Sequence, residues 1–138
     1  MKIRLYEDAK DKLAVISLWK LVFVINLPHH DPFASINRKL SENDDLFFVA
    51  TTDENKVIGT IMVGYDGHRG WIYALAVDPK HRKKGIGAML LAQAEKILKN
   101  RNCPKINLQI ETWNQEVIEF YRKNGYQVEE RISMGKIL

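Results

Sequence analysis

The chain has 138 residues, of which 46% are hydrophobic and 28% charged, and its formal net charge is +4. These values fit one globular domain over residues 1–138 and exclude a disordered or collagen-like chain. The single cysteine, Cys103, excludes an intrachain disulfide scaffold and a cysteine-rich zinc module. We find neither a secretory signal nor an apolar stretch long enough for a membrane span, so we expect a soluble, cytoplasmic domain.

Periodicity and capping residues predict the elements at the start of the chain. Alternation predicts a strand over residues 2–6. Asp8 is expected to cap a helix over residues 10–26, whose apolar residues run almost all round and so predict burial on more than one side. Asp31 followed by Pro32 is typical of a helix start, and predicts a short helix to about residue 40.

Three strands in a meander are predicted next, over residues 46–52, 56–65 and 71–77. The first two are joined by a polar turn. Asp66 and Gly67 form a strong hairpin signal between the second and the third, because these residue types favour the tight turns that connect antiparallel strands.

The remaining elements alternate between helix and strand. Helical spacing of apolar residues predicts a helix over residues 85–101, and alternation predicts a half-buried strand over residues 106–111. Asn114 opens a last helix that stops near Gly125, and the tail over residues 126–138 is expected to form one or two strands. The fold class is therefore α/β, with a mixed sheet covered by helices and with the strands on either side of the helix over residues 85–101 parallel.

The most informative segment runs from the end of the third meander strand into the following helix. A basic cluster containing Arg82 precedes two glycines, Gly85 and Gly87, at the expected helix start. Free backbone N–H groups and the helix dipole favour an anion at such a place, and Arg82 adds a fork of donors for phosphate oxygens. The pattern is neither a P-loop, since no Lys-Ser/Thr pair follows the glycines, nor a dinucleotide fingerprint, since Leu90 occupies the third glycine position. A plain helix start beside a solvated loop is the alternative.

Two stretches of the chain resemble the GNAT N-acetyltransferase superfamily. The first is Leu75-Ala76-Val77-Asp78-Pro79 followed by Arg82-x-x-Gly85-x-Gly87. The second is Asn114-x-x-Val117-x-x-Phe120-Tyr121-x-Lys123-x-Gly125-Tyr126. Their separation and the element order are also similar, and residues 64–70 and 103–106 further resemble the uncharacterised bacterial YpeA-like branch. The resemblance implies a central, mostly antiparallel sheet with one parallel, splayed pair of strands and flanking helices.

The resemblance also implies acetyl-CoA as the donor, with no metal. The pyrophosphate would lie on the N–H groups of the glycine loop and first helical turn, and the pantetheine arm would bond to the main chain of the preceding strand. The implied cofactor-binding residues are Leu75, Ala76, Val77, Arg82, Lys83, Lys84, Gly85, Ile86, Gly87, Ala88, Asn114 and Tyr121. For Asn114, simple helix capping is an equal alternative.

Direct transfer of the acetyl group to a primary amine, in a ternary complex, is the reaction that the resemblance implies. Tyr121 corresponds to the family tyrosine near the sulfur and would act as general acid, the alternative being a tyrosine packed beside Phe120. The backbone N–H of Leu75 is the expected donor to the oxyanion.

The general base stays open. The family often places a carboxylate early in the strand before the phosphate loop, whereas residues 71–73 of this chain are Trp, Ile and Tyr. Glu111 on the expected neighbouring strand is the leading substitute, acting directly or through water, and His68 and Asp66 are others. A structural or surface role is the alternative for each of them, and a water-mediated base would need none of the three.

Other binding partners are weighed against this interpretation. A metal site at His29 and His30 is disfavoured, because Asp31 serves as a helix cap and adjacent histidines point in different directions. Whether His29, His30 or His68 contacts the substrate is open. The acceptor is also open: a small polyamine-like or aminoglycoside-like molecule, an amino acid, or the N-terminus or a lysine of a protein.

Two rival functions are a catalytically weak acetyl-CoA-binding sensor or scaffold and a nucleic-acid binder that uses residues 81–84. The absence of an acidic residue at positions 71–73 favours the sensor or scaffold. The absence of interleaved aromatic and basic residues disfavours the nucleic-acid binder. We therefore expect neither nucleic acid nor membrane as a partner. The apolar first helix and tail would allow a homodimer, but the sequence does not decide between monomer and dimer.

Overall fold

The computed structural model describes residues 1–24 and 27–138. The chain folds into two compact units, Met1–Leu108 and Gln109–Leu138. Whether these two units form the single domain expected over residues 1–138 depends on how they associate, so the single domain stays a prediction.

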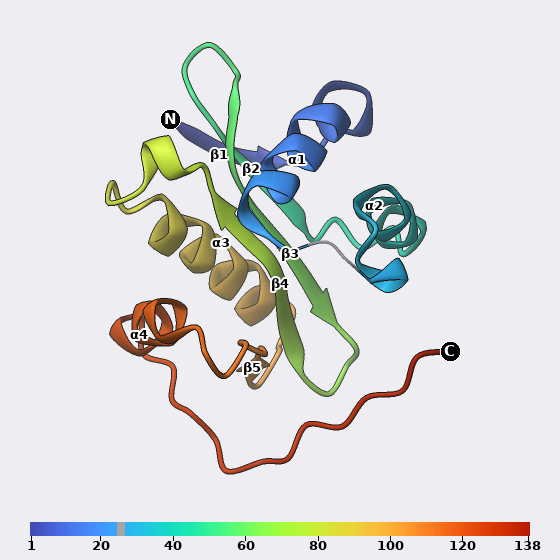
Figure 1. The fold of residues 1–138 in the computed structure, drawn as a ribbon, viewed down its shortest axis with the longest axis vertical. Coiled ribbons are helices and arrows are strands. Elements are labelled where there is room, and N and C mark those ends of the chain that lie inside the picture. The colour runs from blue at the N-terminus through green and yellow to red at the C-terminus, as the bar shows by residue number, and fades with distance from the viewer. Residues whose placement is uncertain (25–26) are drawn as a thin grey trace. The chain divides into compact units, whose positions relative to one another are not determined.

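The larger unit is built on a sheet of five strands in the order β1-β2-β3-β4-β5 (Figure 1). Its strands are Lys2–Leu5 (β1), Phe47–Thr51 (β2), Val57–Tyr65 (β3), Gly70–Val77 (β4) and Ile106–Asn107 (β5). The first four strands pair in antiparallel fashion, and β4 pairs with β5 in parallel. The predicted α/β class, the meander and the parallel pair are confirmed.

Helices cover both faces of this sheet. They are Asp8–Val22 (α1), Pro32–Ser41 (α2) and Ile86–Asn100 (α3). On β3, the hydroxyl of Thr60 contacts the indole of Trp19 from α1, whereas a Cβ added at the adjacent Gly59 would lie 3.0 Å from Leu90 of α3. Because successive strand residues face opposite sides of a sheet, α1 and α3 pack on opposite faces. The short distance at Gly59 also explains why a glycine stands there: α3 approaches the strand too closely for a larger residue.

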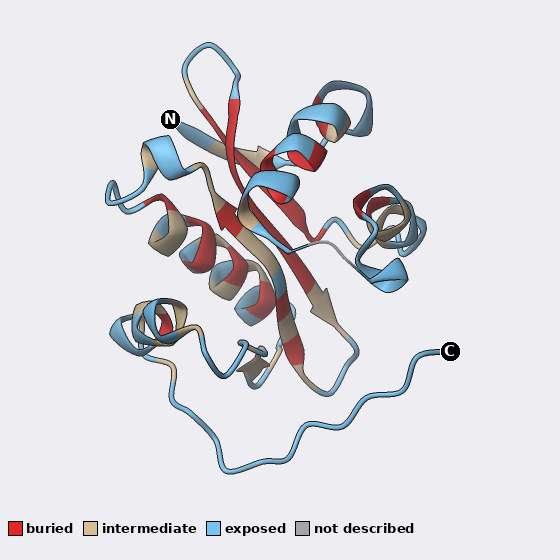
Figure 2. Ribbon diagram, in the orientation of Figure 1, coloured by how far each residue is buried: buried red, intermediate tan, exposed pale blue. Residues whose placement is uncertain are grey.

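A hydrophobic core fills the α1 face of the sheet. Figure 2 shows buried residues along the central strands and on parts of both α1 and α3. It joins the inner sides of α1 and α2 to alternate residues of the strands. Its members are Tyr6, Val15, Ile16, Leu18, Trp19, Ile36, Phe47, Val49, Val57, Met62 and Ala76. The rings of Tyr6 and Phe47 stack with centroids 4.4 Å apart, which fixes the end of β1 on β2.

Two expectations about the first helix are wrong. Burial on more than one side is not found, because Leu13 is 73% and Leu21 64% exposed while the buried residues gather on the side facing the sheet. Asp8 does not cap the helix. Glu7 is the N-cap residue, and the Asp8 carboxylate instead accepts a hydrogen bond of 2.7 Å from the Tyr6 hydroxyl. The predicted end of this helix, at residues 25 and 26, lies outside the described residues.

A partly buried ion pair links β1 to α1. The Arg4 guanidinium donates two hydrogen bonds to Asp11, at 2.7 and 2.9 Å, and the backbone N–H of Glu7 donates a third at 2.8 Å. Burial alone would raise the pKa of Asp11, but the bonds from Arg4 and Glu7 outweigh it and hold that pKa below its usual value. The Asp11 side chain is only 2% exposed, so its charge is stabilised by Arg4 in place of water.

Substitution Asp11→Ala is expected to lower the free energy of unfolding by about 3 kcal/mol, because it strands the Arg4 charge in a half-buried site. Since folding lowers the pKa of Asp11, its contribution is complete above about pH 4 and is lost as pH falls through the lowered value. Urea unfolding at several pH values should therefore show a shallower acid loss for the variant than for wild type. Asp53→Ala, which removes an exposed ion pair with the N-terminus, is the control and should change little.

The predicted start of α2 is confirmed. Asp31 is its N-cap, and the carboxylate accepts a hydrogen bond of 3.0 Å from the backbone N–H of Ala34, with Pro32 in the first helical position. The helix predicted over residues 85–101 is also confirmed, as α3. It turns Ile86, Leu90, Leu91, Ala94 and Leu98 inward.

The predicted strand over residues 106–111 is wrong beyond Asn107, where β5 ends, and the described tail over residues 126–138 contains no strand. Ile132 and Met134 of the tail are 91% and 90% exposed. An alternating pattern indicates a surface that suits a strand, but a strand forms only where a neighbour supplies hydrogen bonds. The smaller unit instead contains one helix, Gln115–Lys123 (α4), among its described residues. Asn114 caps it as predicted, and Gly125 follows it at φ +91°.

Candidate functional site

The junction between β4 and α3 is built by short-range hydrogen bonds. The backbone N–H of Asp78 donates to the carbonyl of Ile58 at 2.8 Å, which holds the end of β4 against β3. The Asp78 carboxylate accepts a bond of 2.9 Å from the N–H of Lys80, and a single 3-10 turn, Pro79–His81 (η2), follows. The proline in the first position of this turn has no N–H to donate to a neighbouring strand, so β4 does not continue.

The loop then reverses direction at two residues in the left-handed region. Lys83 has φ +62° and Gly85 has φ +78°. A Cβ placed on Gly85 would meet nothing within 4 Å, so the glycine is required by its backbone angle and not by crowding. This geometry brings the chain into α3 with Gly85 as the N-cap residue.

The first turn of α3 presents unpaired amides. The first bond at this helix end runs from the N–H of Met89 to the carbonyl of Gly85, at 3.0 Å. The N–H groups of Ile86, Gly87 and Ala88 precede it and have no acceptor among the described residues. Because α3 is 15 residues long, the positive end of its dipole coincides with these donors. The arrangement suits a phosphate group.

Basic side chains surround these amides. Arg82, Lys83 and Lys84 are all exposed. The Nε of Arg82 donates to the carbonyl of Val77 at 3.4 Å, which keeps its guanidinium beside the end of β4. The structure therefore places together the predicted residues of the last three positions of β4, the loop and the first turn of α3. They are Leu75, Ala76, Val77, Arg82, Lys83, Lys84, Gly85, Ile86, Gly87 and Ala88.

A β-bulge interrupts β4 just before Leu75, and the sequence analysis missed it. Met62 pairs with Tyr73 while Thr60 pairs with Ala76, so β4 has one more residue than β3 in this interval. Ala74 has φ +49°, a left-handed conformation that costs about 1 kcal/mol for a residue with a Cβ. Its carbonyl accepts a 2.8 Å hydrogen bond from the buried hydroxyl of Thr60. Alanine has no preference for such a backbone angle, so the sequence carries no local signal for this bulge.

Asn114 and Tyr121 lie in the smaller unit. The carbonyl oxygen of the Asn114 side chain accepts a bond of 3.3 Å from the N–H of Val117, so its capping role is observed. The Tyr121 side chain is 7% exposed and packs edge-on against Phe120 and Tyr126, with centroids 5.1 and 5.5 Å away. Burial raises the pKa of Tyr121, so the phenol keeps its proton at neutral pH.

The hydroxyl of Tyr121 is available as a donor. It has no hydrogen-bond partner among the described residues. Every buried side-chain oxygen or nitrogen in that part of the chain does have a partner, so the Tyr121 hydroxyl oxygen is in contact with solvent. The packing beside Phe120 and the function as an acid are therefore compatible: the ring is fixed and the hydroxyl is unoccupied.

The candidate bases differ in their surroundings. Glu111 is exposed and lies outside β5, so the expectation that it sits on a strand beside β4 is wrong. Asp66 closes the β3–β4 hairpin by accepting bonds of 2.8 Å from the N–H groups of Arg69 and His68. These two bonds lower its pKa, which makes Asp66 a weaker base. His68 is exposed at the same turn. Of the aromatic residues early in β4, Trp71 is half-buried and Tyr73 is exposed.

The two adjacent histidines form a local contact. The rings of His29 and His30 lie with centroids 4.2 Å apart, and the carbonyl of His29 accepts a bond from Arg38. Among the described residues, no group of three or more His, Cys, Asp or Glu side chains is placed to hold a metal ion. Within the same residues, no helix combines the length and the apolar character that a membrane crossing requires.

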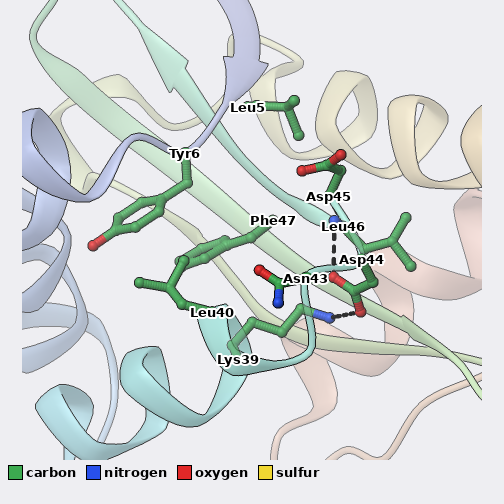
Figure 3. A pocket seen from close by; sticks show the side chains of 9 residues that line it. All are labelled: Leu5, Tyr6, Lys39, Leu40, Asn43, Asp44, Asp45, Leu46 and Phe47. Atoms are coloured by element: carbon green, nitrogen blue, oxygen red, sulfur yellow. Dashed lines mark hydrogen bonds and ion pairs between the residues drawn. The ribbon is translucent and has the colours of Figure 1, made fainter.

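A small pocket of about 130 Å³ lies between the end of α2 and the start of β2 (Figure 3). The ammonium of Lys39 lies 2.7 Å from Asp44, whose other carboxylate oxygen accepts a bond from the N–H of Leu46. Lys39 also donates to the carbonyl of Val63. None of the predicted site residues lines this pocket, and the Lys39 ammonium in it is already paired with Asp44.

Comparison with known proteins decides the family. The model of the acetyltransferase (GNAT) family matches residues 12–126. The chain belongs to the GNAT acetyltransferase family. An acetyltransferase of Pectobacterium atrosepticum is 41% identical over 138 residues, with 100% of this chain and 96% of that protein covered. One of Sodalis glossinidius is 42% identical over 139 residues, with the same coverage. The predicted superfamily is thereby confirmed, and the YpeA-like branch stays a prediction.

Solved structures agree on the fold. An aminoglycoside antibiotic 6'-N-acetyltransferase from Acinetobacter haemolyticus matches with a TM-score of 0.78 at 19% identity, covering 100% of this chain and 99% of that chain. The PaiA N-acetyltransferase from Thermoplasma acidophilum, solved in complex with coenzyme A, matches with a TM-score of 0.79 at 23% identity, covering 96% of this chain and 94% of that chain. This GNAT chain thus shares their fold.

Proposed function

We propose that this protein is an N-acetyltransferase that moves the acetyl group of acetyl-CoA to a primary amine by direct attack in a ternary complex. The observation that carries the proposal is the set of unpaired amides at the start of α3, between Arg82 and Met89, in a chain of the GNAT family. The relative from Thermoplasma acidophilum was solved with coenzyme A bound, which supports the choice of donor.

The pyrophosphate of acetyl-CoA would bind at these amides. Its oxygens would accept hydrogen bonds from the N–H groups of residues 84–88, while Arg82 and Lys83 supply charge-assisted bonds from the side. The exposure of Arg82, Lys83 and Lys84 supports this, because each can turn toward a ligand without breaking a buried contact.

The pantetheine arm would lie along β4. Strand β5 pairs with β4 only at Gly70 and Trp71, so residues 72–77 have no strand on that side among the described residues. An extended arm with amide groups can use the backbone of Leu75, Ala76 and Val77 in the way that an added strand would. The arm would carry the thioester toward the bulge at Ala74.

In the reaction, the amine nitrogen forms a bond to the carbonyl carbon and the carbon–sulfur bond breaks. The backbone N–H of Leu75 would stabilise the negative charge on the carbonyl oxygen, and Tyr121 would give its proton to the departing thiolate. The amine proton leaves to water or to a base, for which Glu111 and His68 are the remaining proposals. Asn114 would bind the CoA arm through its side-chain amide N–H group, since its oxygen caps α4.

A panel of acceptors tests this function. Release of the free thiol from acetyl-CoA should be measured with a polyamine, an aminoglycoside, an amino acid and a peptide that has a free N-terminus and a lysine. Structural neighbours include an aminoglycoside acetyltransferase and a NatC complex bound to a Gag peptide and CoA, so both small molecules and peptides belong in the panel. We expect transfer to at least one amine, identified by mass. Binding of acetyl-CoA without transfer to any of them would contradict the enzymatic proposal.

That outcome would favour the second candidate, a sensor or scaffold that holds acetyl-CoA. Two observations support this candidate: residues 71–73 carry no acid, and the carboxylate of Asp66 is engaged by two backbone N–H groups with a lowered pKa. Such a protein would bind acetyl-CoA and coenzyme A with measurable affinity and release no thiol.

A further inference from the structure

A buried relay of hydrogen bonds ends at the bulge of β4. The indole Nε1 of Trp19 donates to the Thr60 hydroxyl at 2.9 Å, and that hydroxyl donates to the carbonyl of Ala74 at 2.8 Å. Trp19 is 4% and Thr60 0% exposed. The direction of the relay is unambiguous, because an indole N–H can only donate and a hydroxyl has one proton to give.

The relay fixes the orientation of one peptide group. Ala74 is in the left-handed region at φ +49°, where the pairing between β3 and β4 is interrupted. The peptide that joins Ala74 to Leu75 is trans, so its carbonyl and its N–H point in opposite directions. Since the carbonyl points to Thr60 on β3, the N–H of Leu75 points away from β3. On that side β4 has lost its pairing with β5, which ends opposite Trp71.

We propose that Thr60 and Trp19 are positioning residues for the acetyl transfer, holding the Ala74–Leu75 peptide so that the Leu75 N–H faces the thioester oxygen. The inference rests on the proposed function and adds to it the groups that aim the donor. A left-handed alanine would relax toward an ordinary strand conformation if its carbonyl lost its partner, and the N–H would then turn back toward β3. Thr60 acts through Leu75 and touches neither substrate.

The Thr60→Val substitution removes the hydroxyl and keeps the shape of the side chain. We expect it to lower kcat about tenfold to a hundredfold, with acetyl-CoA affinity within about twofold of wild type, since an oxyanion donor acts in the transition state. Thr60→Ser restores the hydroxyl and should restore kcat. Thr51→Val is the matched control, because it removes another buried hydroxyl from the same sheet, far along the chain from the bulge.

A spectroscopic measurement tests the inference without the acceptor amine. Infrared difference spectra of bound acetyl-CoA, labelled with ¹³C at the carbonyl, report how strongly the oxygen is polarised. We expect wild type, Thr60→Ser and Thr51→Val to lower the carbonyl stretch relative to free acetyl-CoA, and Thr60→Val to lose most of that shift. A wild-type stretch in Thr60→Val would overturn the positioning role and leave the proposed function standing. No shift in wild type that binds acetyl-CoA would overturn the positioning role together with the Leu75 donor, and would leave acetyl transfer to be decided by the panel of acceptors.

The two proposals fail in different ways. If wild type does not bind acetyl-CoA, the proposed function fails, and calorimetry shows this before any spectrum is recorded. If Thr60→Val does not fold, Trp19→Phe carries the same test, because the hydroxyl then loses the donor that fixes its direction. An unchanged carbonyl shift in folded Trp19→Phe would overturn the relay.

Discussion

The double substitution Arg82→Ala, Gly87→Glu is expected to weaken acetyl-CoA binding by at least about a hundredfold. It removes a fork of donors and places a carboxylate beside amides that have no acceptor among the described residues. A charge-assisted hydrogen bond contributes about 1.5–3 kcal/mol, and repulsion between the new carboxylate and the pyrophosphate adds to its loss. A total of about 3 kcal/mol corresponds to roughly a hundredfold in the dissociation constant. Isothermal calorimetry with acetyl-CoA measures it.

A control with the same change in net charge separates this local effect from a general one. Arg131→Ala, Gly135→Glu alters two exposed residues of the tail, and a Cβ at Gly135 meets nothing within 4 Å. We expect the control to bind as wild type does, and both variants to keep the thermal unfolding midpoint of wild type within a few degrees. Equal affinity in the loop variant and in wild type would remove the start of α3 as the cofactor site.

The features of the fold and of the candidate site that the sequence predicts correctly are local. Asp31 and Asn114 cap their helices through bonds to N–H groups three residues away, and Gly125 takes a positive φ after α4. Each depends on the chemistry of a residue and its nearest neighbours along the chain. The loop proposed to bind the pyrophosphate can therefore be recognised from its own residues, and the resemblance to the family adds acetyl-CoA as the proposed ligand.

The features that escaped prediction depend on distant partners. The carbonyl of Ala74 in the bulge bonds to Thr60, which lies 14 residues away along the chain. Thr60 in turn bonds to Trp19, which lies a further 41 residues away. Alternation predicts a strand that contains Glu111, yet β5 ends at Asn107. Alternation indicates which residues would share a face if a strand formed, but hydrogen bonds to a neighbour decide whether it does. Asp8 is a local exception: the hydroxyl of Tyr6, two residues away, bonds to its carboxylate, and the helix begins with Glu7 as the N-cap residue.

Replacing Tyr121 by phenylalanine is expected to lower kcat about a hundredfold while acetyl-CoA affinity stays within about twofold. The change removes the proton donor proposed for the thiolate, and general acid catalysis contributes at least about this factor. Phenylalanine keeps the edge-on contacts with Phe120 and Tyr126, so the fold of the smaller unit is preserved. Tyr65→Phe, a half-buried tyrosine of β3, is the control.

The pH dependence of kcat provides an independent check on Tyr121. Burial raises the pKa of this phenol above its ordinary value near 10, so its proton is retained as pH rises through 9 and 10. Ionisation of Tyr121 should therefore cause no fall in wild-type kcat between pH 9 and pH 10. The kcat profiles of wild type and Tyr121→Phe should have the same shape in that range. A fall near pH 9 in wild type that is absent from the variant would mean that the proton leaves a less buried phenol than the one observed. Unchanged kcat in Tyr121→Phe would withdraw the acid role, because the hydroxyl is the only atom that the substitution removes.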